Sequence, residues 1–184
     1  MRIIVIVFLL LSISSCMVKP GKYPVIGSVQ RLDPSLDAVI DKDAVIEVVA
    51  DGFDWSEGPL WLPDQKKLLF SDIPPNTIYQ WTEAEGASVY LTPSGYTGPQ
   101  PRGGEKGSNA LLLDARGRLV LCQHGDRRMA VMDAPLDAPR PAFTTLADRW
   151  EGLRLNSPND AVYRSDGALI FTDPPYGQIG RAHV

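Results

Sequence analysis

Three stretches of the chain repeat one pattern: Glu57–Phe70 (EGPLWLPDQKKLLF), Asn109–Leu121 (NALLLDARGRLVL) and Asn159–Phe171 (NDAVYRSDGALIF). Their first residues lie 52 and 50 positions apart. Each copy begins with an oxygen-bearing side chain, continues through an apolar run and a polar turn, and ends in a second apolar run. A period of this size is typical of propellers and other repeat arrays. The repeat therefore predicts a fold and a candidate site together.

A second hairpin follows the first in two of the repeats. In the first repeat, residues 78–81 and 87–91 flank a turn, and in the second repeat residues 129–132 and 142–146 do so. Four short strands without helical periodicity predict a propeller blade. Because one such sheet cannot bury both of its faces, blades pack against their neighbours around a ring. We expect an all-β fold, with residues 44–178 forming part of a propeller.

The N-terminal residues 1–16 have the pattern of an export signal. Arg2 precedes the apolar run Ile3–Leu11, which is too short to span a bilayer. The run ends in Ile13-Ser14-Ser15-Cys16, which resembles the lipobox of bacterial lipoproteins. This resemblance implies that Cys16 is lipidated and that the domain is held at a membrane, in the periplasm or outside the cell. An ordinary signal peptide with an incidental cysteine is the alternative.

Two further segments flank the repeats. Residues 17–43 are expected to form a spacer, with a short amphipathic piece near residues 32–40, and residues 44–50 are expected to form a β-strand. At the other end, residues 179–184 (IGRAHV) resemble one reading frame of a sequencing adaptor and are treated as an artefact. We therefore expect the chain to be an N-terminal fragment of about three blades.

Composition narrows the classes of function. The chain is 44% apolar and 22% charged, with a net charge of −4, and no Lys/Arg cluster indicates a nucleic-acid partner. Apart from Cys16, Cys122 is the one cysteine, so no disulfide is expected within the domain. Cys122 follows an apolar strand, where a buried, inert thiol is favoured over a nucleophile. No protein partner is implied.

Equivalent loops of a propeller point to the same end of its channel, so Glu57, Asn109 and Asn159 should converge. A carboxylate and two amide oxygens are hard donors that suit Ca²⁺ better than Zn²⁺. The alternative for each residue alone is a solvated charge or a turn-forming Asn. Three such residues in register favour a site for one divalent cation, with calcium as the default.

Several motifs in order resemble the gluconolactonase family, which includes the regucalcin-type lactonases. They are Glu57-Gly58-Pro59, Leu69–Pro74 (LFSDIP), Cys122-Gln123-His124-Gly125, Leu155–Asp160 (LNSPND) and Phe171–Gly177 (FTDPPYG). The resemblance covers residues 46–177. It implies a six-bladed propeller with one divalent cation in its channel, here truncated to about three N-terminal blades.

The resemblance also implies roles for single residues. Glu57 and Asn159 match metal ligands, and Asn109 matches a residue that contacts substrate or metal-bound water and is a possible further ligand. An Asp that serves as ligand and general base is expected about fifty residues beyond Asn159, past position 184. His124 either steers a lactone oxygen or water near the channel mouth, or is a structural histidine at a strand end.

Three aspartates also receive expected roles, and two positions of the chain differ from the family pattern. Asp173 and Asp72 occupy matching places, which suggests a structural role, and Asp160 is placed to bond loop backbone and orient Asn159. Many relatives carry Glu where this chain has Gln123, and some carry Arg where it has Gly107. The substrate preference of these relatives is therefore not transferred to this chain.

The expected activity is metal-dependent opening of a sugar lactone to its aldonic acid, with the fragment itself inactive. In this scheme the cation polarises the ring carbonyl and holds the attacking water. The alternative from another class is a lipid-anchored propeller that binds a ligand around a structural cation without turnover. A third alternative is hydrolysis of a different ester, such as a phosphotriester.

Overall fold

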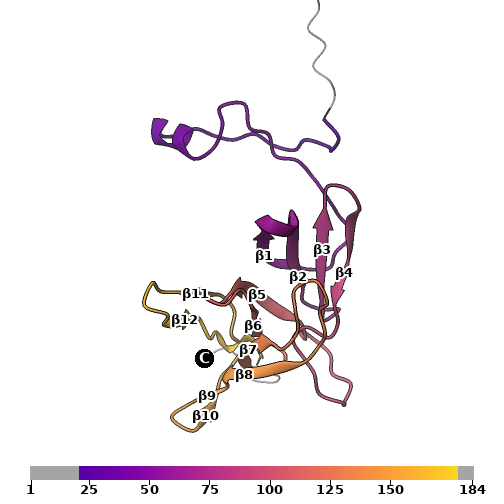
Figure 1. Cartoon of the computed structure of the whole chain (residues 1–184), viewed down its shortest axis with the longest axis vertical. Coiled ribbons are helices and arrows are strands. Elements are labelled where there is room, and N and C mark those ends of the chain that lie inside the picture. The colour runs from indigo at the N-terminus through magenta and orange to yellow at the C-terminus, as the bar shows by residue number, and fades with distance from the viewer. Residues whose placement is uncertain (1–20, 178–184) are drawn as a thin grey trace, which may run out of the picture. The chain divides into compact units, whose positions relative to one another are not determined.

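The computed structural model describes residues 21–177 and divides the chain into two compact units, residues 1–49 and 50–184. The predicted signal segment with Cys16 and the predicted artefact at 179–184 lie outside the described residues. The units are described separately. All the paired strands belong to the second unit (Figure 1).

In the first unit, residues 21–49 contain little regular structure. A 3₁₀ helix, η1 (Pro34–Ala38), lies within the expected amphipathic segment but buries none of its residues. The strand predicted over residues 44–50 is wrong, because only Glu47 pairs, in an isolated bridge with Val25. Val45 and Ile46 remain 59% and 43% exposed, so the segment has no core to cover. No helix within residues 21–177 is long and apolar enough to cross a membrane.

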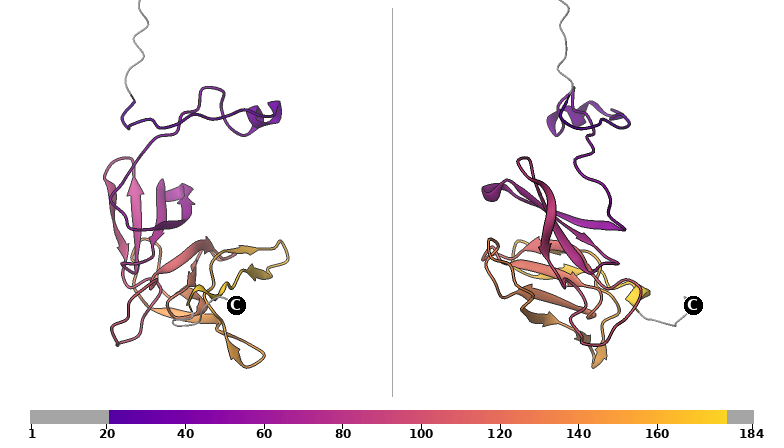
Figure 2. Two further views of the ribbon diagram at one scale, coloured as in Figure 1. Left: turned by 180° about the vertical axis from the view of Figure 1, so that it is seen from behind. Right: turned by 90° about the vertical axis from the view of Figure 1, so that its right-hand side faces the viewer.

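The second unit contains two four-stranded antiparallel sheets, each with its strands in chain order. The first consists of β1 (Ser56–Leu62), β2 (Lys67–Asp72), β3 (Thr77–Thr82) and β4 (Gly86–Leu91). The second consists of β5 (Ser108–Leu113), β6 (Leu119–Gln123), β7 (Arg128–Met132) and β8 (Phe143–Ala147). The four hairpins expected in the first two repeats are thereby confirmed (Figure 2).

The third repeat contributes one hairpin, β11 (Ala161–Tyr163) with β12 (Leu169–Phe171). Before it lies a tight hairpin of β9 (Arg149–Trp150) and β10 (Leu153–Arg154). Two further 3₁₀ turns, η2 (Pro63–Gln65) and η3 (Pro175–Gly177), complete the described elements. Helix is thus almost absent from the described chain, and the all-β prediction is confirmed.

The second sheet buries both of its faces. Leu119 and Leu121 of β6 join a core cluster that includes Leu69 and Ile78 of the first sheet. Val120 and Cys122 point to the opposite face, as alternate residues of a strand must, and pack with the β11–β12 hairpin. The sheets therefore pack one after another in repeat order, each on its neighbour.

Cys122 is fully buried and free in this second cluster. Burial raises the pKa of its thiol to about 12, and the negative charge of Asp160 acts in the same direction. The thiolate is the reactive form of cysteine, so the neutral thiol at this position is inert. The predicted structural role of Cys122 is confirmed.

Candidate functional site

The candidate residues of the first two repeats lie at β-bulges. The pairing of β1 with β2 shifts register between Glu57 and Leu60, and that of β5 with β6 shifts between Ser108 and Leu111. A bulge places an extra residue on one strand and re-aims the side chains there. The same local irregularity in two repeats therefore presents Glu57 and Asn109 in equivalent ways.

One pocket of about 180 Å³ is lined by all three predicted residues. Its walls are Glu57, Gly58, Pro59, Asn109, Ala110, Asn159 and Asp160. Each repeat contributes to the pocket walls only the residues at the beginning of its first hairpin. The structure thus brings together side chains that are about fifty residues apart, as the repeat predicts.

Hydrogen bonds between the repeats hold these loops against each other. The buried Ser71 hydroxyl donates to the Asn109 carbonyl oxygen over 2.8 Å and contacts the Ser108 hydroxyl at 2.8 Å, from which it accepts. The backbone N–H of Ala110 donates to the Asn159 carbonyl oxygen over 3.0 Å. A continuous chain of polar contacts therefore links β2, β5 and the third repeat at the pocket.

Gly58 allows the closest backbone approach at the pocket. Its φ is +55°, a conformation that L side chains rarely adopt. A Cβ there would lie 2.7 Å from the Cα of Ala110 and would also overlap the Asn109 carbonyl oxygen. Glycine is therefore required at this bulge both for its backbone angle and for the contact between the first and second repeats.

The donor chemistry of the pocket fits a hard divalent cation. Asn109 is 5% exposed, and neither its amide nor that of Asn159 hydrogen-bonds to another described side chain or backbone group. Glu57 accepts one bond, from the indole of Trp55 at 3.3 Å. Within residues 21–177 no three His, Cys, Asp or Glu side chains form a metal cluster. The amide oxygens of Asn109 and Asn159 beside the carboxylates of Glu57 and Asp160 suit Ca²⁺, which takes about six to eight oxygen ligands.

His124 does not line this pocket. Its side chain is 1% exposed, and its Nε2 atom lies 3.3 Å from Oε2 of Glu105. Burial, with the positive charge of Arg102 second, lowers the pKa of His124 to about 4. The ring is therefore neutral at neutral pH, so this contact is no ion pair. Neither ring nitrogen forms a hydrogen bond within the described structure.

The three aspartates have structural contacts. Asp72 accepts the backbone N–H groups of Trp55 and Asp54 at 2.7 and 3.2 Å. Asp173 accepts those of Asn156 and Ser157 at 2.9 and 2.8 Å. Each thus anchors the loop that leads into the first strand of its repeat, as their matching positions suggest. Asp160 lines the pocket and accepts the N–H of Ala161 at 2.8 Å.

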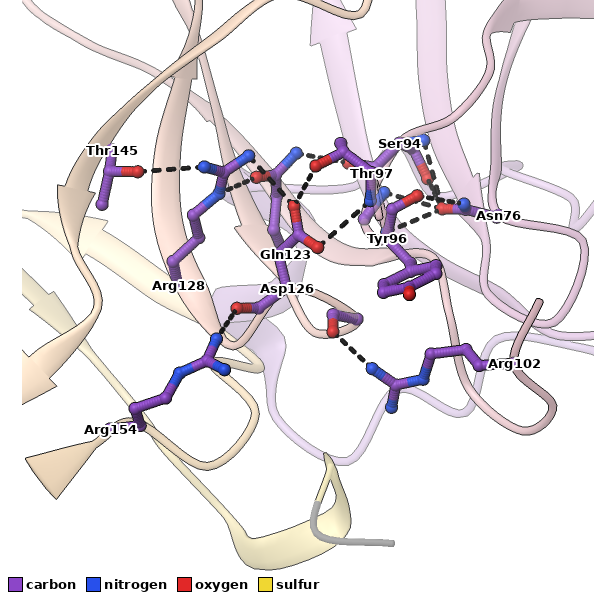
Figure 3. A network of polar contacts seen from close by, with 12 residues as sticks. Asn76, Ser94, Tyr96, Thr97, Arg102, Gln123, Asp126, Arg128, Thr145 and Arg154 are labelled. Carbon is purple, nitrogen blue, oxygen red and sulfur yellow. Dashed lines mark hydrogen bonds and ion pairs between the residues drawn. The ribbon is translucent and has the colours of Figure 1, made fainter. Parts of the chain in front are cut away.

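In the second repeat, Gln123 anchors the loop before the first strand, as Asp72 and Asp173 do in theirs. It pairs with Ser108 as Asp72 pairs with Ser56, and it is fully buried. Its Nε2 atom donates to the Ser94 carbonyl oxygen over 2.9 Å, and its Oε1 atom accepts from Nε of Arg128 over 2.6 Å (Figure 3). Both ends of the amide are used, so Gln123 holds the loop before β5 and does not face the pocket.

Replacing Gln123 with Glu should destabilise the protein at pH 7. The carboxylate would still accept from Arg128 but would turn an oxygen toward the Ser94 carbonyl, where a donor is needed. We expect a loss of about 1–3 kcal/mol of unfolding free energy, reduced at pH 5 as the carboxyl becomes protonated and can donate. Urea unfolding at both pH values measures this. Gln65→Glu, at an exposed turn, is the control, and equal stability of Gln123→Glu and wild type at pH 7 would contradict the assignment.

Sequence reasoning missed the residues that couple the loops. Ser71 and Gly58 lie inside motifs that identify the repeat, yet nothing in the sequence shows which backbone they approach. Their one signal is position: Gly58 directly follows a candidate ligand, and Ser71 pairs with Glu57 across the β1–β2 ladder.

Residues 55–183 match the SMP-30/Gluconolactonase/LRE-like region family. A gluconolactonase of Zymomonas mobilis is 40% identical over 154 residues, which are 83% of this chain and 42% of that protein. A solved gluconolactonase from Xanthomonas campestris is 34% identical with a TM-score of 0.62, covering 86% of this chain and 46% of that one. A second solved structure, of a putative gluconolactonase, is 35% identical with a TM-score of 0.57. The match covers 70% of this chain and 39% of that one.

The chain therefore spans less than half the length of these relatives. The family match nevertheless covers all three repeats and every residue that lines the candidate pocket. The chain belongs to the SMP-30/gluconolactonase/LRE-like family.

Proposed function

We propose that the full-length protein hydrolyses a sugar lactone to its aldonic acid with the help of one divalent cation, calcium by default. The observation that carries the proposal is the convergence of Glu57, Asn109 and Asn159 on one pocket in a chain related to gluconolactonases. The relatives' names supply the substrate class, and the oxygen donors supply the cofactor class.

Each of the three side chains has a separate task in this proposal. Glu57 and Asn159 would hold the cation, and Glu57 would also neutralise part of its charge. Asn109, almost buried and with an amide not engaged by other described residues, would orient substrate or water through its carboxamide. When bound, the cation would supply Lewis-acid polarisation of the lactone carbonyl. The proton of the attacking water would pass to an Asp one repeat further on, as the family resemblance implies.

The fold proposal follows from the same repeat. The two four-stranded sheets would be complete blades and the β11–β12 hairpin half of a third, within a six-bladed ring. The neighbour-on-neighbour packing of the sheets supports this arrangement. In such a ring the pocket loops would face the central channel.

We also propose that the protein is exported and held at a bacterial membrane by lipid on Cys16, in the periplasm or on the outer membrane. The lipobox-like segment Ile13–Cys16 supports this localisation. Cys16→Ser should move the protein from the membrane fraction to the soluble fraction of cells. Unchanged fractionation of Cys16→Ser would oppose lipid anchoring.

Lactone turnover with and without chelator tests the proposed function. Full-length protein should hydrolyse gluconolactone, lose this activity after exhaustive chelation, and regain it when Ca²⁺ is added back. Full activity after verified removal of all metal would exclude the role given to the cation. No hydrolysis of any aldonolactone by the metal-loaded protein would exclude the lactonase assignment.

A further inference from the structure

The loop between β4 and β5 forms a second pocket, which shares no residue with the first. It has a volume of about 380 Å³ and is lined by Asn76, Pro93, Tyr96, Thr97, Gly98, Pro99, Gln100, Pro101, Arg102 and Lys106. Two cationic side chains and no carboxylate line it, although the chain carries a net charge of −4. Neither Arg102 nor Lys106 forms an ion pair with another described residue. The lining of the pocket is therefore positively charged.

The walls of this pocket are held in place before any ligand arrives. The Asn76 side-chain oxygen accepts the backbone N–H groups of Gly95 and Tyr96 over 2.7 and 3.1 Å, and its Nδ2 donates to the Tyr96 carbonyl. Thr97 donates its N–H and hydroxyl to Asp126 over 3.1 and 2.5 Å (Figure 3). Because the loop is already ordered, ligand binding loses little free energy to ordering its residues, which favours specific recognition.

The Arg102 side chain offers an edge that suits an anion. Its guanidinium lies 5.1 Å from the centre of the Tyr96 ring, and its Nη1 donates to the Gly125 carbonyl over 2.6 Å. Its Nε–H is buried and lacks a hydrogen-bond partner in the described structure. The Nε and Nη2 donors form one edge of the guanidinium, the edge that carboxylates bind in bidentate fashion. A ligand carboxylate would supply the missing acceptor, and because the Nε–H is buried, the Arg102 side chain would have to turn this edge toward the pocket when the ligand binds.

No described carboxylate forms an ion pair with Arg102, and the carboxylate of Glu105 in the same loop lies against His124 at 3.3 Å. His124 beneath the loop is neutral, and the Arg102 charge contributes to the low pKa of that ring. The carboxylate of Asp126, on the adjoining turn, accepts a hydrogen bond from the Thr97 hydroxyl and forms an ion pair with Arg128, whose Nη2 lies 3.1 Å from Oδ2. Lys106 adds a second positive charge three residues before Asn109, so the pocket lies at the same end of the second sheet as the candidate cation site.

We propose that this second pocket binds the carboxylate of a sugar acid, the product class of the reaction assigned above, at a place separate from the cation pocket. Arg102 and Lys106 would hold the carboxylate, and the ring of Tyr96 and the Gln100 amide would meet the sugar carbons and hydroxyls. The choice of a sugar acid rests on the proposed function. The selectivity for an anion over a neutral sugar rests on the charges alone.

Calorimetric titration of gluconate into the full-length, metal-stripped protein tests this inference, because metal removal prevents binding through the cation site. Gluconate should bind with a dissociation constant on the order of 1 mM, and neutral glucose at least about tenfold more weakly. Lys106→Gln, which removes a charge without breaking a described contact, should weaken gluconate about tenfold. Arg102→Gln should abolish binding, and Arg116→Gln, at an exposed turn, should leave it unchanged. Thermal melts verify that each variant is folded.

The outcomes separate this inference from the proposed function. Gluconate binding that depends on Lys106 would support the second pocket even if no lactone were hydrolysed. Equal binding of gluconate and glucose, or unchanged binding by a folded Lys106→Gln variant, would overturn it even if lactonase activity were intact. Absence of gluconate binding to the metal-stripped wild type would overturn it as well.

Discussion

Gly58→Ala should destabilise the full-length protein by about 2–4 kcal/mol and displace the loops of the candidate site. Two costs add at this position. A non-glycine residue at a φ of +55° costs about 1–2 kcal/mol, and forcing a methyl group into packed backbone costs about 1–2 kcal/mol. The added Cβ would meet Asn109 and Ala110, so the second repeat must move away from the first. Urea unfolding measures the loss of stability, and lactone turnover measures the displacement.

Gly117→Ala is the matched control for this substitution. Gly117 also has a positive φ, +74°, but a Cβ there would meet nothing within 4 Å. Only the backbone cost applies, so this variant should lose about 1–2 kcal/mol and keep full turnover. If Gly58→Ala were no more destabilising than Gly117→Ala, the close contact between the first two repeats would be absent in solution.

Glu57→Gln should reduce lactone turnover by at least about 100-fold while leaving the fold intact. Of Glu57, Asn109 and Asn159, only Glu57 carries a charge, and the amide of Gln keeps its size but not its attraction for a cation. Its single described hydrogen bond, from Trp55, can still be accepted by the amide oxygen. The loss should therefore appear in activity and hardly in stability.

Glu85→Gln gives the comparison for Glu57→Gln. It makes the same chemical change in the turn between β3 and β4, at the opposite end of the first sheet from Glu57. Turnover by Glu85→Gln should equal that of the wild type. Near-normal turnover by Glu57→Gln would remove this residue from the site and with it the metal assignment.

The sequence was enough to predict the hairpins and loops whose residue pattern recurs in each repeat. The hairpins follow from alternating apolar runs around polar turns, and the shared pocket of Glu57 and Asn109 follows from the register of equivalent loops. The strand expected at residues 44–50 failed for a physical reason. Its apolar residues match a strand pattern, but Val45 and Ile46 find no face to pack on, and burial rather than pattern decides whether a strand forms.

Contacts between repeats could not be predicted in the same way. Nothing in the sequence indicates that Ser71 donates to the Asn109 carbonyl or that Gly58 touches the second repeat, because both depend on how two sheets approach. The sequence also left two alternatives for His124. The structure encloses it beneath the β4–β5 loop, outside the walls of the candidate pocket.

Titration of Ca²⁺ into the metal-stripped, full-length protein tests most directly whether Glu57, Asn109 and Asn159 form a cation site. The wild type and Glu85→Gln should each bind one ion at this site with equal affinity. Glu57→Gln and Asn159→Leu, verified as folded by thermal melting, should bind it at least about 100-fold more weakly. Wild-type affinity in both of these variants would contradict the account.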